Sequence, residues 1–372
     1  MEVGTGAVLT VVGLLLLCFG GYALVSGGVA IAKKFRISSL IIGLTIVAYG
    51  TSTPELAVSV ASAFQGETDL ILGNVIGSNI ANIGMVIGIS AIAAPLLITK
   101  GRLIMDKNTI KIWIPIMLGV SALLIILTIV EKNNISREAG YLFIVILIAL
   151  SFFTYHRAKK QRHEKDILTE KQSHEPPSEI DVIKKKEEAG SLPKQRPEDQ
   201  HEHLIGYYQL EKKVDKLPPI VAVVIGAIAL CIGGMLTING SIGIAEGLGI
   251  STTIIGIVIV AIGTSLPELI TSIIALKKGQ ANIGIGNIIG SNIYNILLIL
   301  GVSSIIAGNL STTSLFGPNQ WQNLVPNDFG LMVVFSAVLL IAYKKGIIPW
   351  WGGLALVVFY TIYLIRTSLG IA

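Results

Sequence analysis

Long apolar stretches follow one another along most of this chain, and their length limits the folds available to it. A stretch of about 20 apolar residues can cross a bilayer as a helix, and backbone groups in lipid must be hydrogen-bonded within their own segment. Only 14% of the residues are charged, against about 25% in a soluble domain. We therefore predict an all-α membrane protein with ten transmembrane helices. Their approximate ranges are 6–30, 38–64, 70–97, 110–130, 139–156, 219–245, 251–276, 282–307, 328–343 and 347–368.

An internal duplication divides the chain into two halves. Residues 43–82 align without a gap on residues 256–295, with 20 identities in 40 positions. Each half holds five predicted spans, an odd number, so the second half enters the membrane in the opposite orientation. We therefore expect two inverted-topology five-helix repeats, at 1–156 and 218–372. Many secondary transporters use this arrangement and bind their substrate near the midplane, between the halves.

The segment between the halves, residues 157–217, is hydrophilic. Its 14 basic and 13 acidic residues nearly cancel, and this composition predicts a flexible linker. Of the 28 lysines and arginines in the chain, 25 fall on one side of a ten-span topology, the linker's included. By the positive-inside rule this side is cytoplasmic, which places both termini outside. The net charge of +5 therefore reports topology and gives no indication of a nucleic-acid partner.

The first duplicated motif reads Gly-Thr-Ser-Thr-Pro-Glu at 50–55 and Gly-Thr-Ser-Leu-Pro-Glu at 263–268. Each proline is expected to kink its helix and to free backbone carbonyls. Each glutamate is the only acidic residue of its span, and a carboxylate in hydrocarbon is costly unless it is paired, protonated or bound to a cation. Oxygen atoms are the ligands that Ca²⁺ and Na⁺ require. The candidate ligands are Ala48, Thr51, Ser52, Glu55, Ala261, Thr264, Ser265 and Glu268.

The second duplicated motif reads Gly-Asn-Val-Ile-Gly-Ser-Asn-Ile-Ala-Asn at 73–82 and Gly-Asn-Ile-Ile-Gly-Ser-Asn-Ile-Tyr-Asn at 286–295. Residues four apart share a helix face, so each copy presents a serine together with an asparagine. The candidate ligands of this motif are Ser78, Asn82, Ser291 and Asn295. We expect the other four asparagines, Asn74, Asn79, Asn287 and Asn292, to form interhelical contacts.

Each motif also has a purely structural interpretation. The first could be a proline kink whose hydroxyl groups bond their own backbone, and the Gly, Ser and Asn of the second could serve helix packing alone. No Gly-x-x-x-x-Gly-Lys-Ser/Thr nucleotide-binding loop occurs, so we expect no nucleotide and no direct use of ATP.

The paired motifs resemble the α-repeats of the sodium/calcium exchanger family, within the cation/calcium antiporter superfamily. The resemblance covers both halves of the chain and excludes the linker. It implies a prokaryotic-type, multi-pass plasma-membrane antiporter that exchanges Na⁺ for Ca²⁺, needs no cofactor and is not an enzyme. We expect it to act as a monomer.

Carried onto this sequence, the resemblance makes Glu55 and Glu268 the shared carboxylate ligands, and Asn82 a central ligand. The hydroxyl and carbonyl groups of the first motif, with Ser78 and Ser291, would complete the ion sites. Several microbial members and the potassium-dependent branch have aspartate where Asn295 stands. This departure implies a pocket with two carboxylates and exchange that does not depend on K⁺.

Two ionised glutamates would carry two negative charges, which one Ca²⁺ or two Na⁺ would neutralise. A bare double charge is too costly to move past hydrophobic walls, so only a loaded carrier should switch sides, which is the condition for obligate exchange. Two alternatives remain open: a Ca²⁺/H⁺ antiporter that uses the same glutamates, and a passive cation channel lined by the four motif copies.

Overall fold

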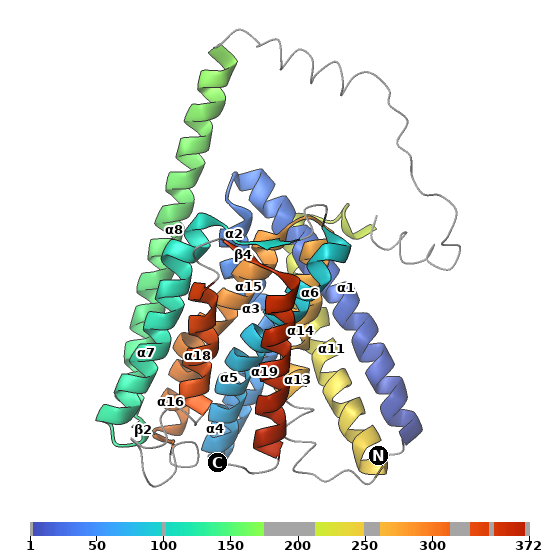
Figure 1. Cartoon of the computed structure of the whole chain (residues 1–372), viewed down its shortest axis with the longest axis vertical. Coiled ribbons are helices and arrows are strands. Elements are labelled where there is room, and N and C mark those ends of the chain that lie inside the picture. The colour runs from blue at the N-terminus through green and yellow to red at the C-terminus, as the bar shows by residue number, and fades with distance from the viewer. Residues whose placement is uncertain are drawn as a thin grey trace.

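The computed structural model describes residues 3–98, 102–174, 213–248, 261–312, 328–341 and 346–368, and these are almost entirely helical. Figure 1 shows the helices packed into a bundle in which most of them run along one common direction. Within the described residues, seven helices are long and apolar enough to cross a membrane. A further span is a bent pair, Ser39–Thr51 followed by Thr53–Gln65, whose two parts differ in direction by 46°.

The described residues fill all ten predicted spans at least in part. In the first half the helices are α1 Val3–Phe35, α2 Ser39–Ile42, α3 Ala48–Thr51, α4 Thr53–Gln65, α5 Thr68–Ala81, α6 Gly88–Leu97, α7 Ile114–Val130 and α8 Arg137–His174. In the second half they are α11 Pro219–Gly247, α13 Ala261–Thr264, α14 Leu266–Lys277, α15 Ala281–Tyr294, α16 Gly301–Ala307, α18 Asp328–Ile341 and α19 Trp350–Ser368. Residues 251–260 of the predicted seventh span lie outside the described residues.

Several spans contain a turn of π-helix, in which the backbone widens by one residue. These turns are η1 Gly43–Val47, η2 Asn82–Ile87, η3 Thr109–Trp113 and η6 Asn295–Leu300. Two of them begin at the same motif position, Asn82 and Asn295. Single π-turns inside α-helices occur often at functional sites, because the extra residue redirects side chains and leaves backbone groups less tightly paired.

Two short antiparallel ladders connect loops of the two halves. Strand β1 (Leu103–Ile104) pairs with β4 (Ile347–Ile348), and β2 (Asn134–Ile135) pairs with β3 (Leu310–Ser311). The spacing of apolar residues predicts only helices, so these ladders could not be predicted from the sequence. Each ladder is two residues long and adds little to a fold that is otherwise all-α.

The inverted orientation of the halves is visible in the pairing of α1 with α11, the first helix of each repeat. Glycines of α1 at positions 6, 13 and 20 contact the backbone of α11 near Gly240, Gly233 and Gly226. Position numbers rise along α1 as they fall along α11, so the two helices are antiparallel, and Figure 1 shows them side by side. Small residues let membrane helices approach closely. A methyl group added at Gly20 would lie 2.8 Å from the Gly226 carbonyl oxygen, so this contact requires glycine.

The most buried spans are those that carry the second motif, Thr68–Leu97 and Ala281–Ala307. They belong to the largest apolar cluster, which extends from α5 and α15 to α7, α18 and α19. Figure 1 shows α5 and α15 within the bundle, while α8 extends well beyond it. The prediction of an all-α membrane protein made of two inverted repeats is therefore confirmed, and both motifs lie in its interior.

Candidate cation-binding site

Each Gly-Thr-Ser-x-Pro-Glu motif lies at a break in a membrane helix. The helix before the break ends one residue before Ser52 in the first half, and one residue before Ser265 in the second. The two serines have nearly the same non-helical backbone, with φ −85° and ψ 6° at Ser52 and φ −91° and ψ 1° at Ser265. Pro54 and Pro267 occupy the first turn of the next helix, where a missing N–H leaves no intrahelical bond unmade.

The two glutamates follow these breaks, in the first turn of α4 and of α14. The positive end of the helix dipole favours a negative group at this position. Both Glu55 and Glu268 are 0% exposed. Ser291 Oγ and Ser52 Oγ lie 3.3 Å and 3.4 Å from Glu268 Oε1, whereas neither carboxylate oxygen of Glu55 has a hydrogen-bond partner in the described part of the chain.

The motif hydroxyl groups bond across the two repeats. Ser52 Oγ lies 2.9 Å from Ser291 Oγ, and Thr51 Oγ1 lies 3.4 Å from the same atom. In the equivalent contact between the other two motif copies, Ser78 Oγ lies 3.3 Å from Thr264 Oγ1. The first motif of each half therefore meets the second motif of the other half, and a kink whose hydroxyls bond only their own backbone does not describe this geometry.

Backbone carbonyls are the other ligands predicted from the first motif, and that of Ala48 already accepts hydrogen bonds within its own segment. The carbonyl oxygen of Ala48 accepts from Ser52 N at 3.0 Å and from Thr51 Oγ1 at 3.3 Å. Pro54 has no N–H to offer the carbonyl four residues earlier, which belongs to Gly50. Ala261 is the first residue of α13 and stands three positions before Thr264, as Ala48 stands before Thr51. Ligation by either alanine stays a prediction.

The amide side chains of Asn82 and Asn295 donate to asparagines of the opposite repeat. Asn82 Nδ2 donates to Asn292 Oδ1, and Asn295 Nδ2 donates to Asn79 Oδ1, both at 2.9 Å. Each amide nitrogen therefore has an acceptor in the opposite repeat. Each amide oxygen, Asn82 Oδ1 and Asn295 Oδ1, is buried and has no partner among the described residues.

A set of buried oxygen atoms is thus left with acceptor capacity in the described part of the chain. On the residues of the two motifs it comprises Glu55 Oε1 and Oε2, Glu268 Oε2, Asn74 Oδ1, Asn82 Oδ1, Asn295 Oδ1 and Ser265 Oγ. A buried acceptor without a partner costs about 1–3 kcal/mol, and more if it is charged. Several of them on motif residues of both repeats form the donor set that a hard cation requires, and the residues present therefore fit a Ca²⁺ or Na⁺ ion as cargo.

Two further asparagines join this network in different ways. Asn74 Nδ2 donates to Glu55 O at 3.0 Å and to Ser59 Oγ at 2.8 Å, and so supports the backbone of Glu55. Asn287, the counterpart of Asn74, accepts from Thr51 Oγ1 at 2.9 Å through its Oδ1. The sequence identified both as interhelical residues, but an asparagine both donates and accepts, so its partner could not be read from the motif.

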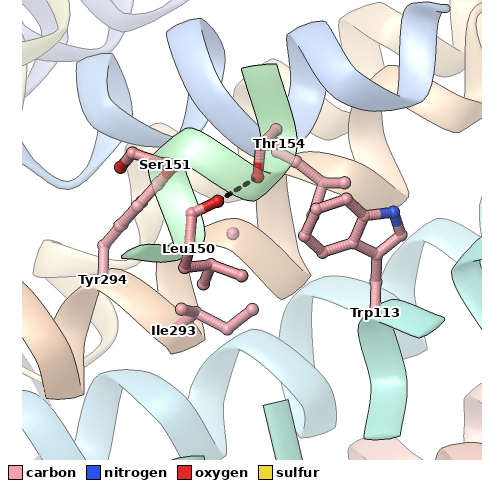
Figure 2. Close-up of a pocket in the computed structure, with 8 residues that line it drawn as sticks. Trp113, Leu150, Ser151, Thr154, Ile293 and Tyr294 are labelled. Atoms are coloured by element: carbon pink, nitrogen blue, oxygen red, sulfur yellow. Dashed lines mark hydrogen bonds between the residues drawn. The ribbon is translucent and has the colours of Figure 1, made fainter. Parts of the chain in front are cut away.

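A small cavity elsewhere in the membrane region offers no comparable ligands. Figure 2 shows it between the helix of Leu150, Ser151 and Thr154 and the helix of Ile293 and Tyr294. The hydroxyl groups of Ser151 and Thr154 donate to carbonyls of their own helix, at 2.8 Å and 2.7 Å. The other labelled side chains are apolar or aromatic, so we do not assign an ion to this cavity.

Two inverted repeats that enclose broken helices and a buried set of oxygen atoms define the class of secondary transporters. A family model described as sodium/calcium exchanger protein matches residues 5–156 and 218–369. The chain therefore belongs to the sodium/calcium exchanger family. It is a multi-span membrane protein and a cation antiporter rather than an enzyme.

Individual relatives match over almost the full length. The putative antiporter CaxA of Alkalimonas amylolytica is 33% identical over 91% of this chain and 90% of its own. The sodium/calcium exchanger MaX1 of Methanosarcina acetivorans is 34% identical over 95% of each chain. A solved structure of the sodium–calcium exchanger NCX_Mj matches with a TM-score of 0.71 and 27% identity, over 98% of this chain and 99% of the other.

Proposed function

We propose that this protein exchanges Na⁺ for Ca²⁺ by alternating access, and that the ions bind between the two repeats, at the midplane of the membrane. The observation that carries the proposal is the set of buried motif oxygens, including those of Glu55 and Glu268, that have no hydrogen-bond partner among the described residues. Their burial cost persists in the ion-free protein and is relieved when a cation binds. The candidate ligands are the twelve residues that the two motifs supply: Ala48, Thr51, Ser52, Glu55, Ser78, Asn82, Ala261, Thr264, Ser265, Glu268, Ser291 and Asn295.

The charge of these residues supports exchange rather than one-way transport. The candidate ligands include two carboxylates and two neutral asparagines, so one Ca²⁺ or two Na⁺ balance the pocket. An empty pocket would expose two uncompensated charges to an apolar pathway during the switch, which is strongly unfavourable. Return of the carrier therefore requires a second cation, and this couples the two fluxes.

Na⁺ is favoured as the counter-ion, and K⁺ is not required. MaX1, to which this chain is 34% identical, is named as a sodium/calcium exchanger. Asparagine at both 82 and 295 leaves the pocket without a third carboxylate that would call for an additional monovalent cation. Competition by protons at Glu55 and Glu268 is the alternative, and it uses the same two side chains.

The distribution of charge supports a location in the cell membrane with both ends of the chain outside. Helix α1 begins and α19 ends at one end of the bundle, while α8 leaves from the opposite end (Figure 1). Lys33 and Lys34 end α1, and Lys277 ends α14; with the basic residues of the linker, these mark the cytoplasmic face. We propose that the exchanger works as a monomer, with Ca²⁺, Na⁺ and the bilayer as its partners and with no nucleotide or other cofactor.

The test is Ca²⁺ uptake by proteoliposomes that contain the purified full-length protein and are loaded with Na⁺. We expect rapid uptake when external Na⁺ is low, no uptake when Na⁺ is equal on both sides, and no effect of adding K⁺ to either side. A pH gradient without a Na⁺ gradient should drive no uptake.

Each alternative predicts a different pattern in the same assay. Uptake that follows the pH gradient and ignores Na⁺ would identify a Ca²⁺/H⁺ antiporter. Uptake that needs no counter-ion, and that depends only on the Ca²⁺ gradient and the membrane potential, would identify a channel. Loss of uptake when K⁺ is omitted would show that the neutral Asn295 does not indicate independence from K⁺.

A further inference from the structure

Two asparagines that are not among the candidate ligands form a reciprocal pair at the contact between α5 and α15. Asn79 and Asn292 occupy the same motif position in the two repeats, and each is 1% exposed. Asn79 Nδ2 donates to the backbone carbonyl of Asn292, and Asn292 Nδ2 donates to the backbone carbonyl of Asn79, both at 3.3 Å. The pair therefore repeats itself under the pseudo-two-fold relation of the halves.

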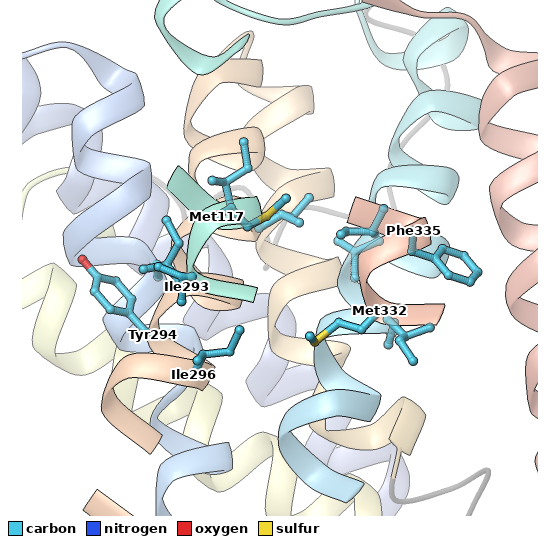
Figure 3. Close-up of a cluster of buried hydrophobic side chains, with 14 of the residues drawn as sticks. Met117, Ile293, Tyr294, Ile296, Met332 and Phe335 are labelled. Atoms are coloured by element: carbon cyan, nitrogen blue, oxygen red, sulfur yellow. The ribbon is translucent and has the colours of Figure 1, made fainter. Parts of the chain in front are cut away.

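Methionine sulfur atoms complete the surroundings of both amide nitrogens. Asn79 Nδ2 also lies 3.5 Å from the sulfur of Met332, and Asn292 Nδ2 lies 3.7 Å from the sulfur of Met117. Figure 3 shows the two methionines in the buried apolar cluster, contributed by α18 and α7. Thioether sulfur and backbone carbonyls only accept hydrogen bonds, so both amide nitrogens must face these atoms and neither amide can turn round without losing its acceptors.

Because the orientation of both amides is fixed, each presents its side-chain oxygen to a candidate ligand of the opposite repeat. With its nitrogen held by acceptors, Asn79 turns Oδ1 toward Asn295 Nδ2, and Asn292 turns Oδ1 toward Asn82 Nδ2, each at 2.9 Å. Asn82 and Asn295 are then oriented in their turn, with both amide nitrogens engaged and both amide oxygens left without a partner in the described part of the chain.

We propose that Asn79 and Asn292 are positioning residues that hold the amide oxygens of Asn82 and Asn295 toward the transported cation. The proposal rests on the cation site described under the proposed function. An unconstrained asparagine can present either its oxygen or its NH₂ group, which are nearly equal in size, and the NH₂ group repels a cation. The crossed bonds between the repeats remove this choice and leave an oxygen at each position.

The same geometry favours a side chain that donates a hydrogen bond at positions 82 and 295. A carboxylate at either position has no N–H, so it would place an acceptor against the fixed Oδ1 of Asn292 or Asn79, where the present distance is 2.9 Å. Two facing acceptors repel each other in a buried site. The pair thus suits the neutral asparagines at these positions, and the pocket charge comes from Glu55 and Glu268.

The test compares Asn79→Leu and Asn292→Leu with the unchanged full-length protein. Leucine is close to asparagine in shape and cannot hydrogen-bond, so the neighbouring amide loses its acceptor. Two measurements are made on each variant: Na⁺-driven Ca²⁺ uptake over a range of external Ca²⁺, and the shift in unfolding temperature that Ca²⁺ causes in detergent. Removing a residue that orients a metal ligand typically costs about 10–100-fold in affinity.

We expect the half-saturating Ca²⁺ concentration to rise by about 10-fold or more in both variants, with a much smaller change in maximal rate, and the stabilisation by Ca²⁺ to shrink in parallel. Ile80→Ala is the matched control, because Ile80 is the buried neighbour of Asn79 and makes no side-chain hydrogen bond. This control should lower the unfolding temperature and leave the half-saturating Ca²⁺ concentration unchanged.

A lower unfolding temperature with an unchanged half-saturating Ca²⁺ concentration in the Asn79 and Asn292 variants would overturn the proposal and leave them as packing residues. If leucine prevents folding, Asn79→Ala and Asn292→Ala remove the same acceptor without adding bulk and carry the same expectation. If the unchanged protein shows no Na⁺-driven uptake, the proposed exchange fails, while the Ca²⁺-induced shift in unfolding temperature still decides whether the pair orients the ligands.

Discussion

The carboxylate of Glu268 lies within hydrogen-bonding distance of two hydroxyl groups, those of Ser52 and Ser291. The carboxylate of Glu55, its counterpart in the first repeat, has no partner among the described residues, and neither has the hydroxyl of Ser265, the counterpart of Ser52. The candidate ligands are the same residues in both copies, so the difference lies in their surroundings and not in the ligands themselves. Identical ligands in unequal surroundings should respond unequally to the loss of the ion.

The aromatic side chains differ between the repeats in sequence as well. The rings of Tyr49 and Tyr294 are stacked, with centroids 4.0 Å apart and planes at 26°. The positions equivalent to them by the duplication are Ile262 and Ala81, which cannot form such a stack. The stack therefore links α3 to α15 without a counterpart that would link α13 to α5. It adds a fixed contact on the side of the site where Thr51 and Ser291 approach each other.

The largest expected effect comes from Glu55→Gln and Glu268→Gln, each of which removes half of the pocket charge. We expect both to reduce Na⁺-driven Ca²⁺ uptake by at least about 100-fold, since the affinity of oxygen sites for Ca²⁺ depends steeply on the number of charged ligands. Retained exchange in either variant would show that its carboxylate is structural. Uptake alone, however, does not separate the two glutamates.

The free energy of unfolding in the absence of ions distinguishes the Glu55 and Glu268 variants. At alkaline pH in ion-free buffer, Glu55→Gln should stabilise the protein by about 1–3 kcal/mol, because it replaces a buried carboxylate that no donor satisfies. Glu268→Gln should give little or no gain, because the charge that it removes is the one that the hydroxyls of Ser52 and Ser291 face. Thermal unfolding in detergent measures both. Equal gains would mean that the two carboxylates have equivalent surroundings in solution.

The sequence was sufficient for the outline of this site. Apolar length predicted the spans, the odd number of spans per half predicted the inversion, and the prolines at 54 and 267 predicted the breaks that the structure has at Ser52 and Ser265. Each of these inferences depends on a local property, such as length or a missing N–H, that does not need the partner to be known.

The pairing of side chains across the repeats was beyond sequence reasoning. An asparagine offers a donor and an acceptor of similar shape, so Asn79 could have faced several groups, and its reciprocal bond with Asn292 depends on how closely α5 and α15 approach. The unequal surroundings of Glu55 and Glu268 could not be predicted either. The candidate ligands around them are the same residues in both repeats, so the ligand sequence does not distinguish the two glutamates.

A smaller effect is expected from Ser52→Ala and Ser265→Ala, which test the equivalent serine hydroxyls of the two copies of the first motif. Ser52→Ala removes a group that contacts both Glu268 and Ser291, and it should lower ion-free stability by about 1 kcal/mol. Ser265→Ala removes a hydroxyl that has no partner within the described ranges, and it should leave ion-free stability unchanged or slightly higher. Thermal unfolding with a chelator present gives the comparison. If Ser265→Ala lowered ion-free stability as much as Ser52→Ala does, the two serine hydroxyls would not differ in their surroundings.

The smallest effect is expected from Tyr49→Ile, which gives the first repeat the residue of the second and abolishes the stack. Tyr49 is 39% exposed, so the substitution loses little buried area. The free energy of unfolding should fall by about 0.5–1.5 kcal/mol, the value of an aromatic pair. Tyr49→Phe is the matched control, because it keeps the ring and removes only the hydroxyl. Because the stack links α3 to α15, half-saturating Ca²⁺ should rise about two-fold in the isoleucine variant, a shift worth about 0.4 kcal/mol. Identical unfolding temperatures and Ca²⁺ dependence in the two variants would show that the stack does not help to hold the site together.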